Sequence, residues 1–328
     1  MNAPANSQFL SNCTVDVLDQ AALALRDGAL IAFPTETVYG LGADAVNPSA
    51  VARIYEVKGR PSDHPLIVHV PSLDSLDVWA SEIPTYSISL ARDFWPGPMT
   101  LVLPRSEIAK DFITGGQESV GIRVPAHPLA LGLLNSFKKF GGLGVAAPSA
   151  NRFGQVSPTT AQDVQEEIGH YLSSTDFILD GGPALVGVES TIIDCTGHSP
   201  LILRHGAITK EMIEASTGRD VIEDEISSIR VSGSLEKHYS PRADVILDAM
   251  AEAGEGFLAL SSIPTPKGAI RLASPSTVDE YARTLYSALR SADAQGLERI
   301  AVIPPEGNGL ALAIRDRLLR ASRGRERQ

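Results

Sequence analysis

Residues 30–61 of the chain have the sequence LIAFPTETVYGLGADAVNPSAVARIYEVKGRP. The apolar run 30–33, which a proline ends, predicts a short buried strand. Asn47 followed by Pro48 is typical of a helix start, and apolar residues then recur at helical spacing until Gly59. A strand, a polar loop and a helix in this order indicate the repeating unit of an α/β domain.

The same alternation continues along the chain, because short apolar runs bounded by proline or glycine recur and predict further strands. Between them, Ser157-Pro158 repeats the Asn-Pro pattern and predicts another helix start ahead of an apolar face. We therefore expect an α/β fold with a mostly buried sheet. The predicted strands are residues 30–33, 66–70, 100–103, 120–124, 144–147, 177–179, 191–193 and 201–203.

After Arg204 the pattern changes. Residues 207–217 predict one more helix, and the polar stretch after it has too few apolar residues to form a core, which is typical of a linker. A second α/β pattern begins near residue 257, and its strand–helix–strand–helix order predicts parallel pairing. Within it, Thr277 and Glu280 predict a capping box at a helix start. At 328 residues the chain has the length of two domains.

The composition excludes several classes of protein. Hydrophobic residues make up 43% and charged residues 20% of the chain, which is ordinary for a globular protein. No apolar stretch approaches the roughly 20 residues that span a bilayer, and the N-terminus does not resemble a secretion signal, so no membrane partner is expected. Cys13 and Cys195 stand alone and favour neither disulfides nor a zinc site. We expect a protein of the reducing cytoplasm.

The net charge of −11 argues against a general nucleic-acid-binding protein, because nonspecific affinity comes largely from basic residues that neutralise phosphates. Residues 315–328 nevertheless carry six arginines. We interpret these arginines as a solvated helix end that the helix dipole favours, in preference to an RNA-binding arm.

Two kinds of cation stand out. Lys58 and Arg60 flank the glycine that ends the first predicted helix, and Pro61 stiffens the exit. Helix capping is the simplest explanation of such a pair, but two fixed cations also suit a polyphosphate. Arg123 lies within an apolar strand and needs a partner or a cleft, so it is either half of a structural salt bridge or a site for a carboxylate.

Polar residues also gather where predicted strands end. The loop 34–45 contains two glycines that allow a close approach of the backbone or a positive φ. Ser149, Asn151 and Ser190 occupy similar positions, which commonly face a ligand in α/β sheets but also commonly cap turns. No P-loop, dinucleotide-binding glycine motif, nucleophile elbow or zinc motif is present. From the residues alone we expect an enzyme with a cationic, hydroxyl-rich cleft for an anionic small molecule.

Seven motifs together resemble the YrdC domain in order and spacing. The HYSP segment at 238–241 and the α/β pattern after it are similar to the long, two-domain form of the threonylcarbamoyl-AMP synthase family. The resemblance implies a twisted mixed sheet with a cationic cleft at 12–206, a linker or lid at 207–241 and a smaller Rossmann-like α/β domain at 242–328. The motifs are PTETVYGLGADA, KGRPSDHPLIVHV, WPGPMTLVL, VGIRVPAHP, APSANRFGQVSPTTA, VGVESTIID and LRHGAI.

As an activity, the resemblance implies that L-threonine, bicarbonate or carbon dioxide, and ATP are joined into L-threonylcarbamoyl-AMP and pyrophosphate. Mg²⁺ normally accompanies the nucleotide. A partner threonylcarbamoyl transferase complex then modifies the adenosine next to the anticodon in tRNAs that read codons beginning with A. Such chemistry needs no protein nucleophile, because fixed cations stabilise the charge that accumulates on the phosphates.

The resemblance also assigns roles to residues of this sequence. Lys58 and Arg60 are the expected catalytic cations, and Arg123 is expected to pair with the carboxylate of threonine. The linker departs from the family pattern at Ser232, where proline usually precedes the glycine, and this frees a backbone angle ahead of Tyr239. The expected threonine pocket is Thr35, His69, Arg123, Ser149 and Ser190, and the expected ATP contacts are Lys58, Arg60, Ser119, Asn151, Thr159, Arg204 and Tyr239.

Three other functions make different predictions. A carbamoyltransferase that matures hydrogenases carries zinc-finger cysteines and further domains, which two isolated cysteines and this length do not supply. A noncatalytic RNA-binding module should lose affinity steeply with salt and ignore threonine. A regulatory amino-acid sensor would not consume ATP.

Overall fold

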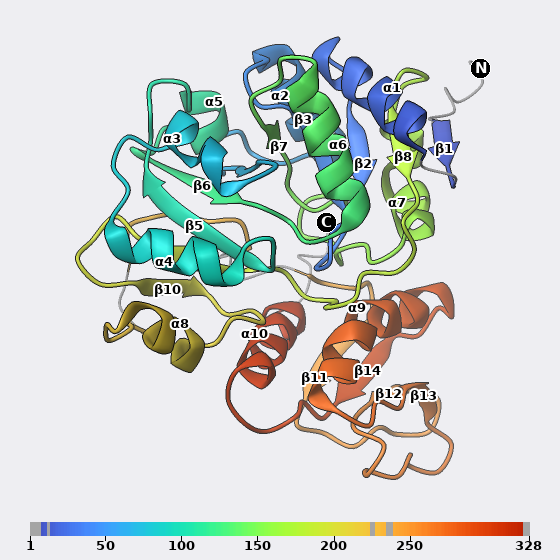
Figure 1. The fold of residues 1–328 in the computed structure, drawn as a ribbon. Helices are drawn as coiled ribbons and strands as arrows, with labels where there is room; N and C mark the ends of the chain where they lie inside the picture. The colour runs from blue at the N-terminus through green and yellow to red at the C-terminus, as the bar shows by residue number, and fades with distance from the viewer. Residues whose placement is uncertain (1–7, 12–13, 224–226, 234–238, 324–328) are drawn as a thin grey trace.

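The structure is a computed structural model that describes residues 8–11, 14–223, 227–233 and 239–323. It contains two sheets, one formed by residues before 205 and one formed by residues after 243 (Figure 1). The α/β class predicted from the sequence is confirmed.

The larger sheet has ten strands, and neighbouring strands pair in both parallel and antiparallel directions. Strands distant in the sequence lie side by side, since β8 runs parallel to both β1 and β2. In spatial order the strands are β1 (Gln8–Leu10), β8 (Phe177–Leu179), β2 (Ile31–Phe33), β3 (Gly40–Asp44), β7 (Val145–Ala146), β4 (Ile67–His69), β6 (Ser119–Arg123), β5 (Met99–Pro104), β9 (Thr191–Asp194) and β10 (Leu201–Arg204).

Helices cover this sheet and bury its apolar side chains. Helices α1 and α6 pack against each other and against the end of the sheet that holds β2 and β8 (Figure 1). The remaining helices pack around a larger cluster of buried side chains. The helices are α1 (Val15–Arg26), α2 (Pro48–Lys58), α3 (Leu76–Trp79), α4 (Thr85–Phe94), α5 (Asp111–Thr114), α6 (Pro128–Lys139), α7 (Ala161–Ile168) and α8 (Lys210–Thr217).

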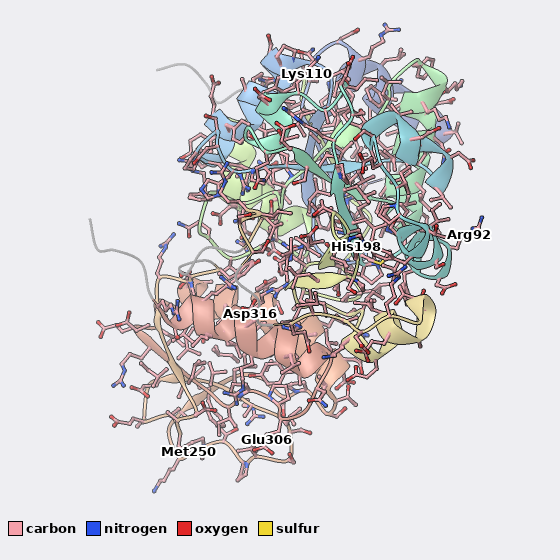
Figure 2. The ribbon with its side chains drawn as sticks, turned by 90° about the vertical axis from the view of Figure 1, so that its left-hand side faces the viewer. Arg92, Lys110, His198, Met250, Glu306 and Asp316 are labelled. Carbon is pink, nitrogen blue, oxygen red and sulfur yellow. The ribbon has the colours of Figure 1, made fainter. Side chains whose placement is uncertain are left out.

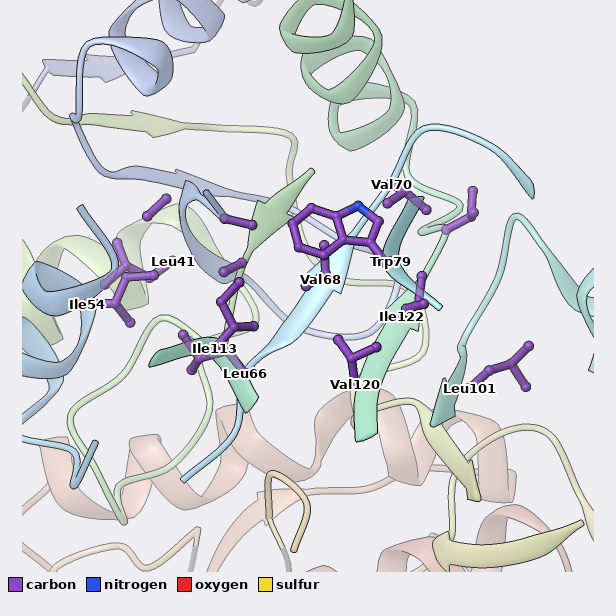
Figure 3. Close-up of a cluster of buried hydrophobic side chains, with 14 of the residues drawn as sticks. Leu41, Ile54, Leu66, Val68, Val70, Trp79, Leu101, Ile113, Val120 and Ile122 are labelled. Carbon is purple, nitrogen blue, oxygen red and sulfur yellow. The ribbon is translucent and has the colours of Figure 1, made fainter. Parts of the chain in front are cut away.

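The larger cluster is centred on the middle of the sheet. Figure 3 shows Val68 of β4 and Val120 and Ile122 of β6 near Trp79, whose indole is fully buried. The indole Nε1 donates to the carbonyl of Leu143 at 3.3 Å, so its polar group is not left unpaired. This core gives β4 and β6 fixed positions, and both strands carry residues of the candidate site.

The second domain has four strands that all pair in parallel, as its strand–helix order predicts. Its helix α10 lies between the two sheets, with Asp316 on it labelled in Figure 2. In spatial order the strands are β11 (Asp244–Leu247), β14 (Arg299–Val302), β12 (Gly256–Leu258) and β13 (Ile270–Ala273), and the helices are α9 (Val278–Ala294) and α10 (Leu310–Ser322).

The segment predicted as a polar loop at 34–45 is in part a strand. Gly40–Asp44 forms β3 and pairs antiparallel with β2. Of the two roles open to the glycines, close approach is the correct one for Gly42, where a Cβ would lie 2.6 Å from Val145 Cγ1 and 2.8 Å from a Phe33 ring carbon. Glycine therefore lets β3 fit between its neighbours.

Helix starts were predicted with mixed success. Asn47 Oδ1 accepts the backbone N–H groups of Ser49 and Ala50, each at 3.1 Å, and Gly59 ends α2 with φ 60°, as predicted. The start at Ser157-Pro158 is wrong, because α7 begins at Ala161 and Thr160 caps it in a reciprocal box with Asp163.

The second predicted capping box is half correct. Thr277 accepts the N–H of Glu280 at 3.1 Å, but the Glu280 carboxylate accepts from Ser276 instead of the N-cap.

Cys195 is buried and free, whereas Cys13 lies outside the described residues. Among the residues that the structure describes, no helix has the length and apolarity that crossing a bilayer requires.

Candidate functional site

A cavity opens at the centre of the larger domain, where β4 and β6 end, β3 and β9 begin, and the linker crosses the sheet. It is lined by Thr35, Thr37, Val38, Tyr39, Gly40, Arg60, Ile67, His69, Arg123, Ala147, Pro148, Ser149, Glu189, Ser190, Arg204, Ser232, Gly233 and Tyr239.

Three guanidinium groups line this single cavity. Arg60, Arg123 and Arg204 come from distant parts of the sequence, and each is at most 7% exposed. Burial lowers the pKa of Arg60 to about 10 and also lowers the pKa of Arg204. Buried cations are costly unless they are balanced, so Arg60 and Arg204, for which the described residues supply no ion pair, indicate a site for a multiply charged anion.

Arg60 and Arg204 both contact the linker. An Arg60 Nη donates to the Ser232 hydroxyl at 3.1 Å, and an Arg204 Nη donates to the Ser232 carbonyl at 2.7 Å. Arg204 also donates to the carbonyl of Ser190 at 2.9 and 3.0 Å. Within the described residues neither arginine forms an ion pair, and the buried Nε of Arg60 has no hydrogen-bond partner.

Arg123 already has an acidic neighbour. One Nη donates to Glu36 Oε1 at 2.5 Å and to the Thr37 hydroxyl at 2.9 Å, while Nε donates to the carbonyl of Gly97 at 3.3 Å. Glu36 also accepts the N–H of Ala126 at 2.8 Å. The structural salt bridge considered for Arg123 therefore exists, and the same guanidinium lines the cavity.

Lys58 holds the loop that follows β7. Its ammonium donates to the carbonyls of Ser149 at 2.6 Å and Asn151 at 2.5 Å, and the side chain is 2% exposed. Burial, with a smaller contribution from Arg60, places the pKa of Lys58 well below its usual range. In this arrangement Lys58 fixes the backbone of the cavity wall and does not itself line the cavity.

His69 lies at the end of β4 with its ring edge against Phe33, the centroids 5.9 Å apart. Burial, reinforced by Arg123, lowers the pKa of His69 to about 3, so the ring is neutral at physiological pH. Within the described residues its buried Nδ1 has no hydrogen-bond partner. A neutral ring nitrogen at the cavity wall can accept a hydrogen bond from a ligand.

Tyr239 closes the cavity from the linker side and is 1% exposed. Its ring stacks on Tyr286 of α9 with centroids 5.6 Å apart, and burial raises the pKa of its hydroxyl to about 12. Its φ of 60° is unusual for a bulky residue. Of the HYSP segment, His238 lies outside the described residues.

Arg317 corrects the interpretation of the C-terminal arginines as a solvated helix end. It is 1% exposed, and its Nε donates to Glu189 at 3.0 Å. Arg315 and Arg320, by contrast, form partly exposed ion pairs with Asp248 and Asp316. The pattern of arginines does not reveal that one face of α10 docks on the larger domain.

Eight of the twelve predicted site residues line the cavity, and four do not. Ser119 lines a neighbouring small cavity together with Arg230 and Val231 of the linker. Asn151 and Thr159 lie in the loop after β7, where Thr159 bonds to Asp163. Lys58 is the fourth. The eight are Thr35, Arg60, His69, Arg123, Ser149, Ser190, Arg204 and Tyr239.

Sequence reasoning assigned no role to ten of the residues that line the cavity, and Thr37, Glu189 and Ser232 are among these ten. Ser232 contacts both arginines, and only the chain's path across the cavity reveals this. Glu189 belongs to the VGVESTIID motif but was assigned no role. Its position between Val188 and Ser190, next to an apolar strand, was a signal that the carboxylate is buried. Among the described residues, no group of three or more His, Cys, Asp or Glu side chains could hold a metal ion.

Comparisons with known proteins agree over most of the chain. A family model described as "Telomere recombination", which unites Sua5, YciO and YrdC proteins, matches residues 23–206. A second model, "Threonylcarbamoyl-AMP synthase, C-terminal domain", matches residues 208–323.

Individual relatives are similar over nearly their full length. A threonylcarbamoyl-AMP synthase of Pyrococcus abyssi is 42% identical over 92% of this chain and 93% of its own. One of Bacillus subtilis is 39% identical over 93% of both chains. The crystal structure of P. abyssi Sua5 complexed with L-threonine superposes with a TM-score of 0.86 at 38% identity, covering 96% of this chain and 97% of the other.

Proposed function

The chain belongs to the threonylcarbamoyl-AMP synthase family, and from this premise we propose how its cavity carries out the reaction. The activity is the ATP-dependent formation of threonylcarbamoyl-AMP, the first step of a tRNA modification. The observation that carries the proposal is the convergence of three buried guanidinium groups and several hydroxyls on one cavity.

Threonine binds at the β4–β6 side of the cavity. Arg123 pairs with its carboxylate, and Thr35, His69, Ser149 and Ser190 surround the rest of the molecule. A neutral His69 suits this position, because it adds no charge near the amine. Support comes from the P. abyssi relative, whose structure contains L-threonine.

ATP binds on the linker side. When ATP binds, Arg60 and Arg204 exchange their hydrogen bonds to Ser232 for contacts with the phosphates. Tyr239 covers the nucleotide. Lys58 acts through the loop at 149–151 that it anchors. The remaining proposed contacts are Ser119, Asn151 and Thr159.

In the reaction, the neutral amine of threonine attacks the carbon of carbon dioxide and releases a proton to solvent, which forms a carbamate; with bicarbonate as the reactant, a molecule of water leaves instead. A carbamate oxygen then attacks the α-phosphorus of ATP, and the bond to the β-phosphate oxygen breaks to release pyrophosphate. Negative charge accumulates on the phosphates in this step, and fixed guanidinium groups stabilise it without rearranging. No protein nucleophile takes part.

Mg²⁺ arrives with ATP, in the common arrangement where phosphates and waters supply most of its ligands. No protein ligand is assigned to it. The product passes to a transferase complex that acts on tRNA, and we place the protein in the cytoplasm. The proposed domain limits are 12–206, 207–241 and 242–328, with the middle segment as a lid.

Pyrophosphate release tests the proposal. It should require ATP, threonine and bicarbonate together, and threonine plus ATP should raise the melting temperature. An RNA-binding module would instead bind RNA in a strongly salt-dependent way without consuming ATP.

Arg60→Ala should reduce the rate of pyrophosphate release about a hundred- to a thousandfold, as the loss of one preorganised charge typically does. Near wild-type release by a stable Arg60→Ala variant would contradict its role.

A further inference from the structure

Glu189 is a charged group at the cavity that the proposed chemistry does not use. It directly precedes Ser190 and β9, lines the cavity and is 6% exposed. A carboxylate here, if unbalanced, would repel the carboxylate of threonine and the phosphates of ATP, since charges interact strongly where water is excluded. The fold must therefore offset its charge.

The offset comes largely from the smaller domain. Arg317 of α10 donates to Glu189 Oε2 at 3.0 Å, and the Tyr286 hydroxyl of α9 donates to the same oxygen at 2.8 Å. Ser157 of the larger domain donates to Oε1 at 2.6 Å. Burial alone would raise the pKa of Glu189, but Arg317, followed by Arg204 and these hydroxyls, lowers it to about 2. Glu189 is thus an anion held by donors from two helices and a loop.

Arg317 contacts the other wall of the cavity as well. Its guanidinium lies 5.5 Å from the centre of the Tyr239 ring, which also stacks on Tyr286. Tyr239 has a left-handed backbone conformation, which is strained for a bulky residue and persists only where surrounding contacts hold it. One arginine of the second domain therefore supports both Glu189 and Tyr239.

We propose that Arg317 is a positioning residue for ATP binding, which offsets the charge of Glu189 and holds Tyr239 at the cavity. Arg317 does not line the cavity, so it acts through these two residues. The smaller domain thereby completes a wall of the site in the larger one. This inference rests on the proposed function, because it requires ATP to bind in this cavity.

Four variants test the proposal by their KM for ATP and kcat in pyrophosphate release. Arg317→Met removes the charge and keeps most of the aliphatic stem, whereas Arg317→Lys keeps the charge. Glu189→Gln combined with Arg317→Met removes both charges. Arg315→Met is the matched control, because Arg315 lies on the same helix and pairs with Asp248 at the surface.

We expect Arg317→Met to raise the KM for ATP about tenfold, the effect of losing one charge-assisted contact. Arg317→Lys and the double variant should both recover much of the affinity, and Arg315→Met should match the wild type. The KM of Arg317→Met should fall as the pH is lowered from 8 to 6. Without its partner, buried Glu189 has a raised pKa and becomes neutral as protons are added.

Several outcomes would overturn the inference. One is that the double variant has the same KM for ATP as Arg317→Met and that the KM of Arg317→Met does not change with pH. Another is that Arg317→Lys raises the KM for ATP as much as Arg317→Met does. If Arg317→Met does not fold, a double variant that folds and binds ATP supports the proposal, and one that fails to fold overturns it. Failure of the wild type to release pyrophosphate would instead contradict the proposed function itself.

Discussion

Arg123 has two possible carboxylate partners, Glu36 in the protein and the substrate threonine. If Arg123 binds the carboxylate of threonine, Arg123→Ala should raise the KM for threonine more than tenfold, because a charge-assisted hydrogen bond contributes about 1.5–3 kcal/mol. The KM for ATP should change little. Steady-state kinetics with each substrate varied in turn measures both.

Arg53→Ala is the control for this prediction. Arg53 pairs with the fully buried Asp176 at 2.6 Å, away from the residues that line the cavity. It should lower stability and leave both KM values unchanged. Equal increases in both KM values for Arg123→Ala would show that its pair with Glu36 is purely structural.

His69 makes stability depend on pH. Its pKa of about 3 in the folded protein lies below the usual 6.5, so the unfolded chain binds the proton more readily between these values. The neutral His69 ring contributes fully to the free energy of unfolding above pH 6.5, and this contribution is lost as the pH falls. Between pH 6.5 and 5 the loss is about 2 kcal/mol, since each pH unit is worth about 1.4 kcal/mol per proton.

Urea unfolding at pH 7 and pH 5 measures this dependence. His69→Asn should be less sensitive to pH than the wild type by about that amount. His64 and His127 also have lowered pKa values from burial and remain in both proteins, so they provide the common background. An unchanged slope in His69→Asn would show that the ring is already accessible to protons in the folded state.

The cations of the site could be recognised from the sequence because each stands in an unusual local context. Arg123 interrupts an apolar strand, and Arg60 follows the glycine that ends a helix. The contact of Glu189 with Arg317 spans 128 residues and two domains, and nothing near either residue indicates the other. Local patterns therefore identified Arg60 and Arg123, but they did not reveal that Arg317 is buried or which charges balance one another.

Among the elements, the linker contributes Ser232, Gly233 and Tyr239 to the cavity wall. We predict that it acts as a lid, so that proteases cut the free protein between residues 222 and 237 and threonine plus ATP protect it. Part of this range lies outside the described residues. Limited proteolysis followed by mass spectrometry gives the cut sites, and cleavage that ignores both ligands would indicate a passive tether.

Gly233 offers a substitution that loosens the same segment. Its φ is 84°, and a Cβ there would collide with the hydroxyl of Tyr239. Gly233→Ala should therefore speed cleavage of the free protein and raise the KM for ATP, while the melting temperature of the protein hardly changes. Gly254→Ala is the control, because Gly254 has a similar φ of 87° with open space around it and lies far along the chain in the second domain.

Sequence patterns predicted strands well where short apolar runs are bounded by proline or glycine. The strands β2, β4, β5, β6, β8, β9 and β10 were all expected near their observed positions. β3 was missed because the segment GLGAD contains two glycines, which normally disfavour strands, and its need for close packing is a property of its neighbours. The start of α7 was misplaced by three residues because the Ser-Pro pair imitates a cap.

At the scale of the whole molecule, the two domains share a hydrophobic cluster. Val38, Val156 and Val188 of the larger domain pack with Tyr286 and Leu285 of the smaller one. A shared core of this kind couples unfolding, so we predict one cooperative transition. Both tryptophans lie in the larger domain, so thermal melts followed by tryptophan fluorescence and by far-UV circular dichroism should coincide.

Leu285→Ala sharpens this prediction. Removing a fully buried leucine from the shared cluster should cost about 2–5 kcal/mol. The fluorescence and dichroism transitions should move down together, although the substitution lies in the smaller domain. A shift of the dichroism curve alone would show that the domains unfold independently.

The strand order of the larger sheet also has consequences for synthesis on the ribosome. β2 and β3 form an antiparallel pair that can assemble as soon as both have emerged. The other edge of β2 pairs with β8, whose residues are translated some 140 positions later, on the order of 10 s at typical elongation rates. Throughout that interval the nascent chain carries an unpaired, wholly apolar strand edge, which is a template for aggregation. A chaperone that shields residues 31–33 until residue 179 has emerged would therefore raise the yield of active protein.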